Sequence, residues 1–338
     1  MKLAFKIGAG LLIALTLLVV GAVATLYLKA ATPEHPVGFA EIAVKDPQDK
    51  PLRVDIWYPT DSPPGMSIVG PSAQKVAAKG AVAGRSLPLV VISHGNGGLA
   101  SSHSDTALAL ASAGFVVAAV THTGDNARDE SYVGTPRWLI DRSRHIHVVL
   151  DHMLNDWPAH EQIDAARVGV FGFSAGGFAA LVSIGGVPDL AQIARHCTAQ
   201  PEFACGLWKQ LPSAPVPETA WVHDPRIKAA VIAAPGYGFA FEPDGLRQVT
   251  AAVQLWNGAE DRNVPYETNT AVVRRLLPTP PEYHAVPGAA HFSFVAPCPS
   301  WLFPLICEDP KGFDRAAFHS DFNGSVVAFF QQQFAARK

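Results

Sequence analysis

A serine set between glycines carries the clearest chemical signal in the sequence. Residues 168–180 read VGVFGFSAGGFAA, so an apolar run typical of a buried strand leads directly to Ser174. Gly-x-Ser-x-Gly at a strand-to-helix turn predicts a nucleophile elbow, which exposes the serine hydroxyl at the end of the strand. Gly172 and Gly176 occupy the positions where larger side chains would collide in so tight a turn. The pattern therefore predicts that Ser174 is a nucleophile.

A serine hydroxyl is a weak nucleophile near neutral pH and needs a base, usually a histidine. In folds with this elbow, the serine is followed along the chain by an acid and then by the histidine. His291 lies in VPGAAHFSF, a glycine-containing loop after a short predicted strand. Two alternatives are His284, inside that strand, and His319, on the last predicted helix. We predict that His291 is the general base.

The base in turn needs an acidic side chain that fixes its tautomer and orientation. The stretch LWNGAEDRNVP ends a predicted strand and places Asp261 in the loop beyond it. We predict that Asp261 is this acid. Its neighbour Glu260 is the main alternative, and Asp244 is a more distant one.

Attack on a carbonyl creates an oxyanion, which backbone N–H groups must stabilise. One donor is expected from Ala175, directly after the nucleophile, and the other from the loop after an earlier strand. That loop reads HGNGG, residues 94–98, and the N–H of Asn96 is our candidate for the second donor. We expect His94 to support the loop rather than to act as a base.

A second polar loop follows another predicted strand. It reads THTGDNARD and contains His122, Asp125 and Asn126. Sites in open α/β sheets form at the carboxyl ends of the strands, so these residues are expected to border the site. The alternative is that they brace the loop.

Three histidines of RHIHVVLDH, at positions 145, 147 and 152, lie on a predicted helix. They complete no pattern of metal ligands, and we interpret them as part of a solvated helix face. We therefore predict no metal, and no residue pattern calls for a cofactor. Nothing basic or clustered suggests a nucleic-acid partner, since the net charge is -3.

Apolar strands alternating with helices indicate the fold class. They predict an α/β fold, a mostly parallel sheet covered by helices on both faces. The first two strands lack a helix between them and could form an antiparallel edge, and residues 60–86, rich in Gly, Pro, Ser and Ala, are expected to be a surface loop. The expected strands are 38–44, 52–59, 87–95, 115–121, 167–173, 227–235, 251–258 and 282–286, and the expected helices 104–114, 136–156, 175–184, 267–277 and 313–334.

Two segments, about 187–226 and 295–312, interrupt the alternation and are interpreted as excursions from the sheet near the site. The four cysteines fall there in two local pairs, Cys197 with Cys205 and Cys298 with Cys307. In an oxidising compartment two disulfides with this local pairing are the simplest account, although three connectivities exist. The aromatic side chains of these segments are expected to border an apolar pocket, or else to pack as secondary cores; they are Phe203, Trp208, Trp221, Trp301 and Phe303.

The N-terminus differs from the rest of the chain. Lys2 and Lys6 precede an uninterrupted apolar run from position 7 to 28, and AVA at 22–24 fits a signal-peptidase site. Residues 1–30 are therefore expected to be a signal peptide or a membrane anchor, since about 20 apolar residues span a bilayer. Either reading predicts an exported protein, periplasmic or secreted, or one associated with the membrane. The sequence does not indicate an oligomeric state.

SHGNGG, GFSAGGF, GAEDRNVP and GAAHFSF, in this order, resemble the dienelactone-hydrolase-like group of α/β-hydrolases, which includes bacterial relatives of platelet-activating-factor acetylhydrolase. The likeness extends over about residues 38–335, the expected catalytic domain. It implies a serine carboxylic-ester hydrolase with Ser174, Asp261 and His291 as the triad. Two departures are visible: dienelactone hydrolases use a cysteine nucleophile, and the acetylhydrolases place their acid after the preceding strand, where AAPGYGFAF offers none.

The expected function is hydrolysis of a small-molecule ester through an acyl-enzyme. Two alternatives remain open: a peptidase similar to prolyl oligopeptidase, whose catalytic domain has this fold, and a non-catalytic binding protein on the same fold. A propeller-sized accompanying domain is missing, and a binding role would not require all three triad residues.

Overall fold

The computed structural model describes residues 16, 21, 28, 30–212, 216–298 and 304–335. Its ten-stranded sheet has the strand order β10-β9-β8-β7-β5-β6-β2-β1-β4-β3. The strands are β1 (Val37–Val44), β2 (Leu52–Pro59), β3 (Gly65–Val69), β4 (Ser72–Ala78), β5 (Leu87–Ser93), β6 (Val116–Thr121), β7 (Ile163–Phe173), β8 (Ile227–Ala233), β9 (Ala252–Gly258) and β10 (Glu282–Val286). The helices are α2 (Ser104–Ser112), α3 (Pro136–Asn155), α4 (Ala175–Ser183), α5 (Leu190–Ala199), α6 (Thr270–Leu276), α7 (Pro304–Cys307) and α8 (Arg315–Ala335).

The predicted α/β class is confirmed. Strands β6, β5, β7, β8, β9 and β10 pair in parallel, each with its neighbour in the sheet. Strand β1 pairs antiparallel with β2, as the missing helix between these two strands suggested. Strand β2 also pairs antiparallel with β6. The carboxyl ends of the parallel strands therefore meet at one edge of the sheet, where sites of this architecture form.

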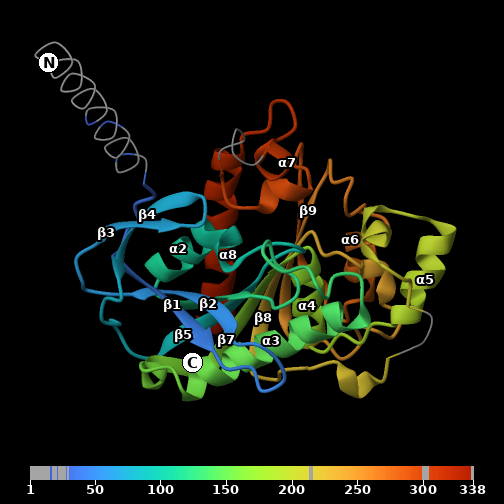
Figure 1. Ribbon diagram of the computed structural model, residues 1–338, viewed down its shortest axis with the longest axis horizontal. Helices are drawn as coiled ribbons and strands as arrows, with labels where there is room; N and C mark the ends of the chain where they lie inside the picture. The colour runs from blue at the N-terminus through green and yellow to red at the C-terminus, as the bar shows by residue number, and fades with distance from the viewer. Residues whose placement is uncertain are drawn as a thin grey trace, which may run out of the picture.

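Both faces of the sheet are covered by helices (Figure 1). On β5, Leu89 and Val91 pack in the core beneath α3 and α4, whereas Val90 and Ile92 pack in the core beneath α2 and α8. All four side chains are buried. Because successive side chains of a strand point to opposite faces, an all-apolar strand is what burial on both faces requires.

The segment 60–86 is where the fold prediction was wrong. It forms the hairpin β3–β4, and β4 extends the sheet by pairing in parallel with β1. Gln74 of β4 is buried, accepts a hydrogen bond from Trp57 Nε1 at 3.0 Å and donates one to the carbonyl of Ser104 at 3.0 Å. These partners are distant in sequence, so the local Gly- and Pro-rich composition did not reveal the strand. The sheet edge is consequently β3 rather than the β1–β2 pair.

The described parts of the two excursions contain short helices among irregular segments, and each excursion holds one disulfide. In the first, Cys197 of α5 is bonded to Cys205 of the 3₁₀ turn η3 (Phe203–Leu207), and in the second Cys298 is bonded to Cys307 of α7. The Cα–Cα distance is 5.5 Å in both pairs, within the usual range. The predicted local pairing is thus present, and it indicates an oxidising, extracytoplasmic compartment.

The predicted signal peptide or anchor, residues 1–30, lies outside the described residues except for positions 16, 21, 28 and 30. Within the part of the chain that the structure describes, no helix combines the length and apolar character needed to cross a bilayer.

Candidate active site

Ser174 lies at the turn between β7, which ends at Phe173, and α4, which begins at Ala175. Its φ of 55° and ψ of -119° fall in a region that residues other than glycine rarely adopt. Such a conformation costs on the order of 1–3 kcal/mol and persists only where the surroundings impose it. The strained turn places Ser174 as the predicted elbow requires.

The two elbow glycines are required by close backbone contacts. A Cβ atom at Gly172 would lie 2.2 Å from the carbonyl oxygen of Gly176. One at Gly176 would lie 2.0 Å from the carbonyl oxygen of Ser93, at the end of β5. Only hydrogen fits at either position, so the turn can pack against the neighbouring strand.

The predicted serine, histidine and acid are brought together. His291 Nε2 lies 2.9 Å from Ser174 Oγ, and His291 Nδ1 lies 2.7 Å from Asp261 Oδ2. A carboxylate can only accept a hydrogen bond, so Nδ1 carries the proton and donates a hydrogen bond to Asp261. Nε2 is then left to accept the hydrogen bond of the Ser174 hydroxyl, the arrangement that a general base needs.

Asp261 is held in place by its second oxygen. Oδ1 accepts hydrogen bonds from the backbone N–H groups of Asn263 at 3.0 Å and Val264 at 2.8 Å. The Asp261 side chain is only 2% exposed. Glu260 and Asp244, the alternative acids, are exposed, and Asp244 lies beside Arg247. Of these three acids, Asp261 is the one hydrogen-bonded to His291.

His291 begins the 3₁₀ turn η6 (His291–Phe294) and is buried, with its ring 4.8 Å from that of Phe173. The alternative His284 is stacked on Trp256 and paired with Glu282, on β10. His319 is likewise engaged elsewhere, in a contact between α8 and α2. Neither alternative lies beside Ser174 Oγ.

The two predicted oxyanion donors, Asn96 and Ala175, line the same small cavity as Ser174 and His291. Ala175 is the first residue of α4, where a helix leaves its N–H without an intrahelical acceptor. Within the described residues, the backbone N–H of Asn96 also donates to no other group. Both N–H groups are thus free to bind a ligand.

The cavity beside Ser174 has a volume of about 70 Å³ and mostly apolar walls. Phe203, Ala204 and Leu207 of η3 form one wall, so the first excursion does border the site. Tyr237, whose hydroxyl donates to the carbonyl of Ala204 at 3.0 Å, forms part of another. A larger hollow of about 870 Å³, between α2, α8 and the segment 32–36, includes none of the triad residues.

The aromatic residues predicted to border the pocket divide into three groups. Phe203 lines the cavity and is 53% exposed. Trp208 and Trp221 do not line the cavity; both are buried, but in the main core rather than in the secondary cores that the alternative expected. Trp301 and Phe303 lie outside the described residues.

His122, Asp125 and Asn126 do not border the cavity; all three are buried beneath the loops. Asn126 Nδ2 donates to the carbonyl of His122 at 2.8 Å, and Asp125 Oδ1 accepts from the N–H of Gly97 at 2.8 Å. The prediction that these three residues border the site is therefore wrong, and the alternative, that they brace the loop, is the one the structure supports. They support the loop that carries Asn96.

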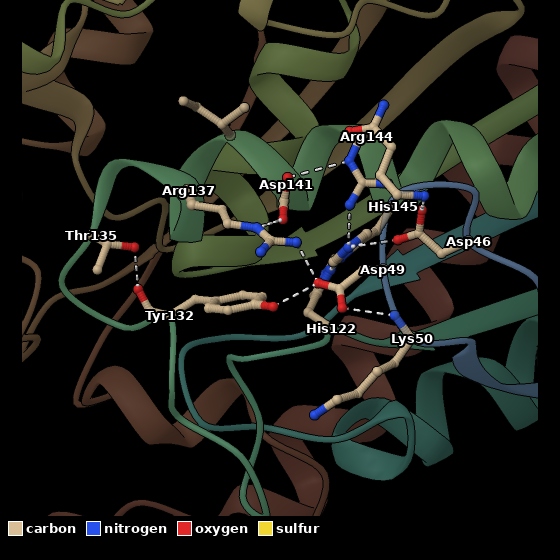
Figure 2. Close-up of polar contacts among 12 residues, drawn as sticks. Asp46, Asp49, Lys50, His122, Tyr132, Thr135, Arg137, Asp141, Arg144 and His145 are labelled. Atoms are coloured by element: carbon tan, nitrogen blue, oxygen red, sulfur yellow. Dashed lines mark hydrogen bonds and ion pairs between the residues drawn. The ribbon is translucent and has the colours of Figure 1, made fainter.

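The predicted solvated face is wrong for His145, which is fully buried, whereas His147 and His152 of the same helix are partly exposed. Figure 2 shows the polar group to which His145 belongs, together with His122, Arg144 and Asp46. His145 Nδ1 lies 3.1 Å from His122 Nδ1, and Arg144 Nη2 donates to His145 Nε2 at 3.0 Å. Burial lowers the pKa values of His122 and His145, so both rings stay neutral near pH 7. The prediction of a solvated face fails for His145 because Asp46, which is distant in sequence, forms a buried ion pair with Arg144 beside the His145 ring.

His94 supports the loop 94–98 as expected. Its Nε2 accepts from the backbone N–H of His122 at 3.1 Å, so Nδ1 carries the proton and donates to the carbonyl of Gly95 at 2.6 Å. Burial, reinforced by the charge of Arg142, lowers the pKa of His94 to about 3. Among the described residues, no group of His, Cys, Asp and Glu side chains is arranged to hold a metal ion.

Arg142 is a residue of this region that the sequence analysis missed. It is buried on α3 and contacts both the loop after β5 and the loop after β6. Its partners are 17 and 48 residues away along the chain, and no local pattern joins them.

A mostly parallel sheet covered on both faces, with a strained serine between β7 and α4 and a histidine after the last strand, defines the α/β-hydrolase fold. The family model of platelet-activating factor acetylhydrolase, isoform II, matches residues 67–138, which include the loop 94–98. A solved structure of a ferulic acid esterase from Streptomyces cinnamoneus matches with a TM-score of 0.63 and 21% identity, covering 90% of this chain and 91% of that one. No curated protein matches the sequence significantly. The fold is thus confirmed, and both matches support the resemblance seen in the sequence.

Proposed function

We propose that the chain is a serine hydrolase that cleaves carboxylic esters through an acyl-enzyme. The observation that carries this proposal is the continuous hydrogen-bond chain from Ser174 Oγ through His291 to Asp261. The strained turn at Ser174 and the unused N–H groups of Asn96 and Ala175 support it. The names of the matched family model, an acetylhydrolase, and of the matched structure, an esterase, favour ester chemistry as well.

In the proposed mechanism, Ser174 Oγ attacks the ester carbonyl while His291 Nε2 takes the hydroxyl proton. Asp261 accepts from Nδ1–H and stabilises the imidazolium that forms. The tetrahedral intermediate collapses when His291 gives the proton to the leaving alkoxide, and the acyl group stays on Ser174. Water, deprotonated by His291, then releases the acid and restores the hydroxyl.

The N–H groups of Asn96 and Ala175 are assigned to the oxyanion. Backbone donors of this kind stabilise the transition state because charge develops on the carbonyl oxygen only as the reaction proceeds. The free N–H of Ala175 also lies at the start of α4, where the helix dipole favours negative charge.

The cavity indicates the size of the acyl group. Its volume of about 70 Å³ accommodates a short chain, and its walls include Trp138, Phe173 and Tyr237, all buried. We therefore assign it to a short acyl group, with the alcohol part of the ester lying toward the more exposed Phe203. Export, with residues 1–30 as signal peptide or anchor, is part of the same proposal.

Hydrolysis of nitrophenyl esters of increasing acyl length, by the natural protein and by Ser174→Ala, tests this function. We expect acetyl and propionyl esters to be cleaved fastest, and activity to fall at least about 10⁴-fold in the variant, as loss of a triad nucleophile does. Equal rates for the two proteins would exclude Ser174 as the nucleophile. Faster cleavage of long-chain esters would exclude the assignment of the cavity to a short acyl group, but would leave Ser174 as the nucleophile.

A further inference from the structure

We propose that Arg142 and Asp125 are a positioning pair for the oxyanion site, which hold the peptide plane between Gly95 and Asn96 in its active orientation. The inference rests on the proposed esterase function and deepens it. It concerns residues that do not touch the cavity, and it assigns a reason for a buried ion pair beneath it.

Arg142 binds the loop through its carbonyls. Its Nη1 donates to the carbonyl of His94 at 2.6 Å and its Nη2 to the carbonyl of Gly95 at 3.1 Å. Its Nε donates to Asp125 Oδ2 at 2.7 Å, and Nη2 contacts the same oxygen. The side chains of Arg142 and Asp125 are each only 1% exposed.

Asp125 binds the other side of the same loop. Its Oδ1 accepts from the N–H of Gly97 at 2.8 Å, and Trp138 Nε1 donates to its Oδ2. The ion pair therefore holds the backbone just before and just after Asn96. Asn96 itself is left with its N–H free for a ligand.

The geometry of the peptide bond connects this pair to the oxyanion. In a trans peptide, the carbonyl of one residue and the N–H of the next point in opposite directions. The carbonyl of Gly95 accepts from Arg142, from His94 Nδ1 and from the N–H of Gly98 at 3.1 Å. With that oxygen directed at three donors, the N–H of Asn96 is directed the opposite way, away from Arg142.

Stability alone does not explain the pair. Removing two charges from water is costly, and well-packed apolar residues often replace a buried ion pair without loss of stability. A planar guanidinium, however, binds two carbonyls and a carboxylate from a rigid fork whose donors point in fixed directions, whereas the three donors of lysine rotate about a single nitrogen. The fork of Arg142 thus suits a role in orientation.

Arg142→Lys tests the proposal, because it keeps the charge but loses the fork. We expect kcat for a nitrophenyl acetate substrate to fall about 10- to 100-fold, since a small misplacement of a catalytic donor has this effect. KM should stay within about threefold. Affinity for a trifluoromethyl ketone, whose serine adduct places an oxyanion at the donors, should fall in parallel with kcat.

Arg144→Lys is the matched control. Arg144 lies on the same helix, is also buried, and pairs with Asp46 and Asp141 rather than with the loop. Its kcat and ketone affinity should stay within about threefold of the natural protein. If Arg142→Lys does not fold, Asp125→Asn replaces it in the test. This variant keeps the Oδ1 acceptor for the N–H of Gly97, and its kcat and ketone affinity are measured in the same way.

Three outcomes overturn the inference: an unchanged kcat in the folded variant, a change in KM alone, or an equal loss in the Arg144→Lys control. These differ from failure of the proposed function, in which the natural protein itself would not cleave the ester. A loss of kcat and ketone affinity confined to Arg142→Lys or Asp125→Asn supports the positioning role.

Discussion

Ser174 has a positive φ that the surrounding backbone imposes through hydrogen bonds on both sides. Its N–H donates to the carbonyl of Ala233 at 3.0 Å, and its own carbonyl accepts from the N–H of Gly236 at 3.1 Å. Both partners lie at the end of β8 or just beyond it. The reactive hydroxyl is therefore positioned by the main chain of two strand ends, and its placement depends on how closely these ends approach each other.

This dependence can be tested at Gly176. In Gly176→Ala the new methyl group would lie 2.0 Å from the carbonyl oxygen of Ser93, so β5 and the elbow must separate. We expect kcat/KM to fall at least about 100-fold, because displacement by an ångström costs this much, and the free energy of unfolding to fall by about 1–3 kcal/mol. Ester hydrolysis and urea denaturation measure the two quantities.

Gly324→Ala is the matched control, since a Cβ atom there would meet nothing within 4 Å on helix α8. It should keep full activity and raise the free energy of unfolding by about 0.5–1 kcal/mol, as alanine does for glycine inside a helix. If Gly176→Ala behaved like this control, the steric account of the elbow would be wrong.

At the scale of elements, one short segment forms a wall of the cavity without belonging to the sheet. The turn η3 is tied to α5 by Cys197–Cys205, and Glu202 beside it accepts hydrogen bonds from Thr268 at 2.8 Å and Asn269 at 3.1 Å, at the start of α6. A disulfide and two side-chain hydrogen bonds thus hold a segment of little regular structure. The size of the acyl pocket should depend on them.

Replacing both cysteines, in Cys197→Ser with Cys205→Ser, should loosen this wall. We expect the preference for acetyl over hexanoyl esters to decrease about 3- to 10-fold, and the free energy of unfolding to fall by about 2–4 kcal/mol, the usual contribution of a disulfide. The acyl-length series of nitrophenyl esters measures the first and denaturation the second.

The double variant Cys298→Ser with Cys307→Ser provides the comparison, because its disulfide holds α7, which contributes no residue to the cavity wall, whereas Cys205 lies in η3, which does. It should lose stability to a similar extent and keep the natural acyl preference. A change in preference of the same size in both double variants would show that η3 has no special part in selectivity.

Sequence periodicity was sufficient for the elements that carry the triad, for a physical reason. Ser174 directly follows the apolar strand β7, and Asp261 and His291 lie in the loops just after β9 and β10. Parallel strands bring such positions to one edge. Sequence periodicity was insufficient for buried polar side chains whose hydrogen-bond or ion-pair partners are distant in sequence. His145 and Arg142 lie in a helix whose charged neighbours suggested solvent, and their buried partners come from loops near Asp46 and Asp125.

Considered as a whole, the described molecule buries several imidazoles on both sides of the sheet. His94, His122 and His145 lie between α3 and the strand ends, and His103 lies against Phe171 on the opposite face. Burial lowers the pKa of His103 to about 4. These side chains fold as neutral rings, which links stability to pH.

We expect stability to decrease as the pH falls from 7 to 5. His94, His103, His122 and His145 have folded pKa values below the unfolded value near 6.5, so the unfolded chain binds more protons in this range. Each fully neutral ring contributes a loss of about 1.4 kcal/mol per pH unit below 6.5. Asp55, with a pKa raised by burial to about 6, acts in the opposite direction but is a single group. Thermal melting at pH 7, 6 and 5 measures the trend, and a constant or rising Tm would contradict it.

Labelling with a fluorophosphonate, which reacts preferentially with an activated serine, tests whether Ser174 is a catalytic nucleophile. We expect one adduct per chain by intact-protein mass spectrometry, located by peptide mapping at Ser174. Labelling should disappear in Ser174→Ala and slow at least about 10²-fold in His291→Ala, since the hydroxyl then lacks its base. An unlabelled natural protein, or an adduct on another serine, would contradict the assignment of Ser174, His291 and Asp261 as a catalytic triad.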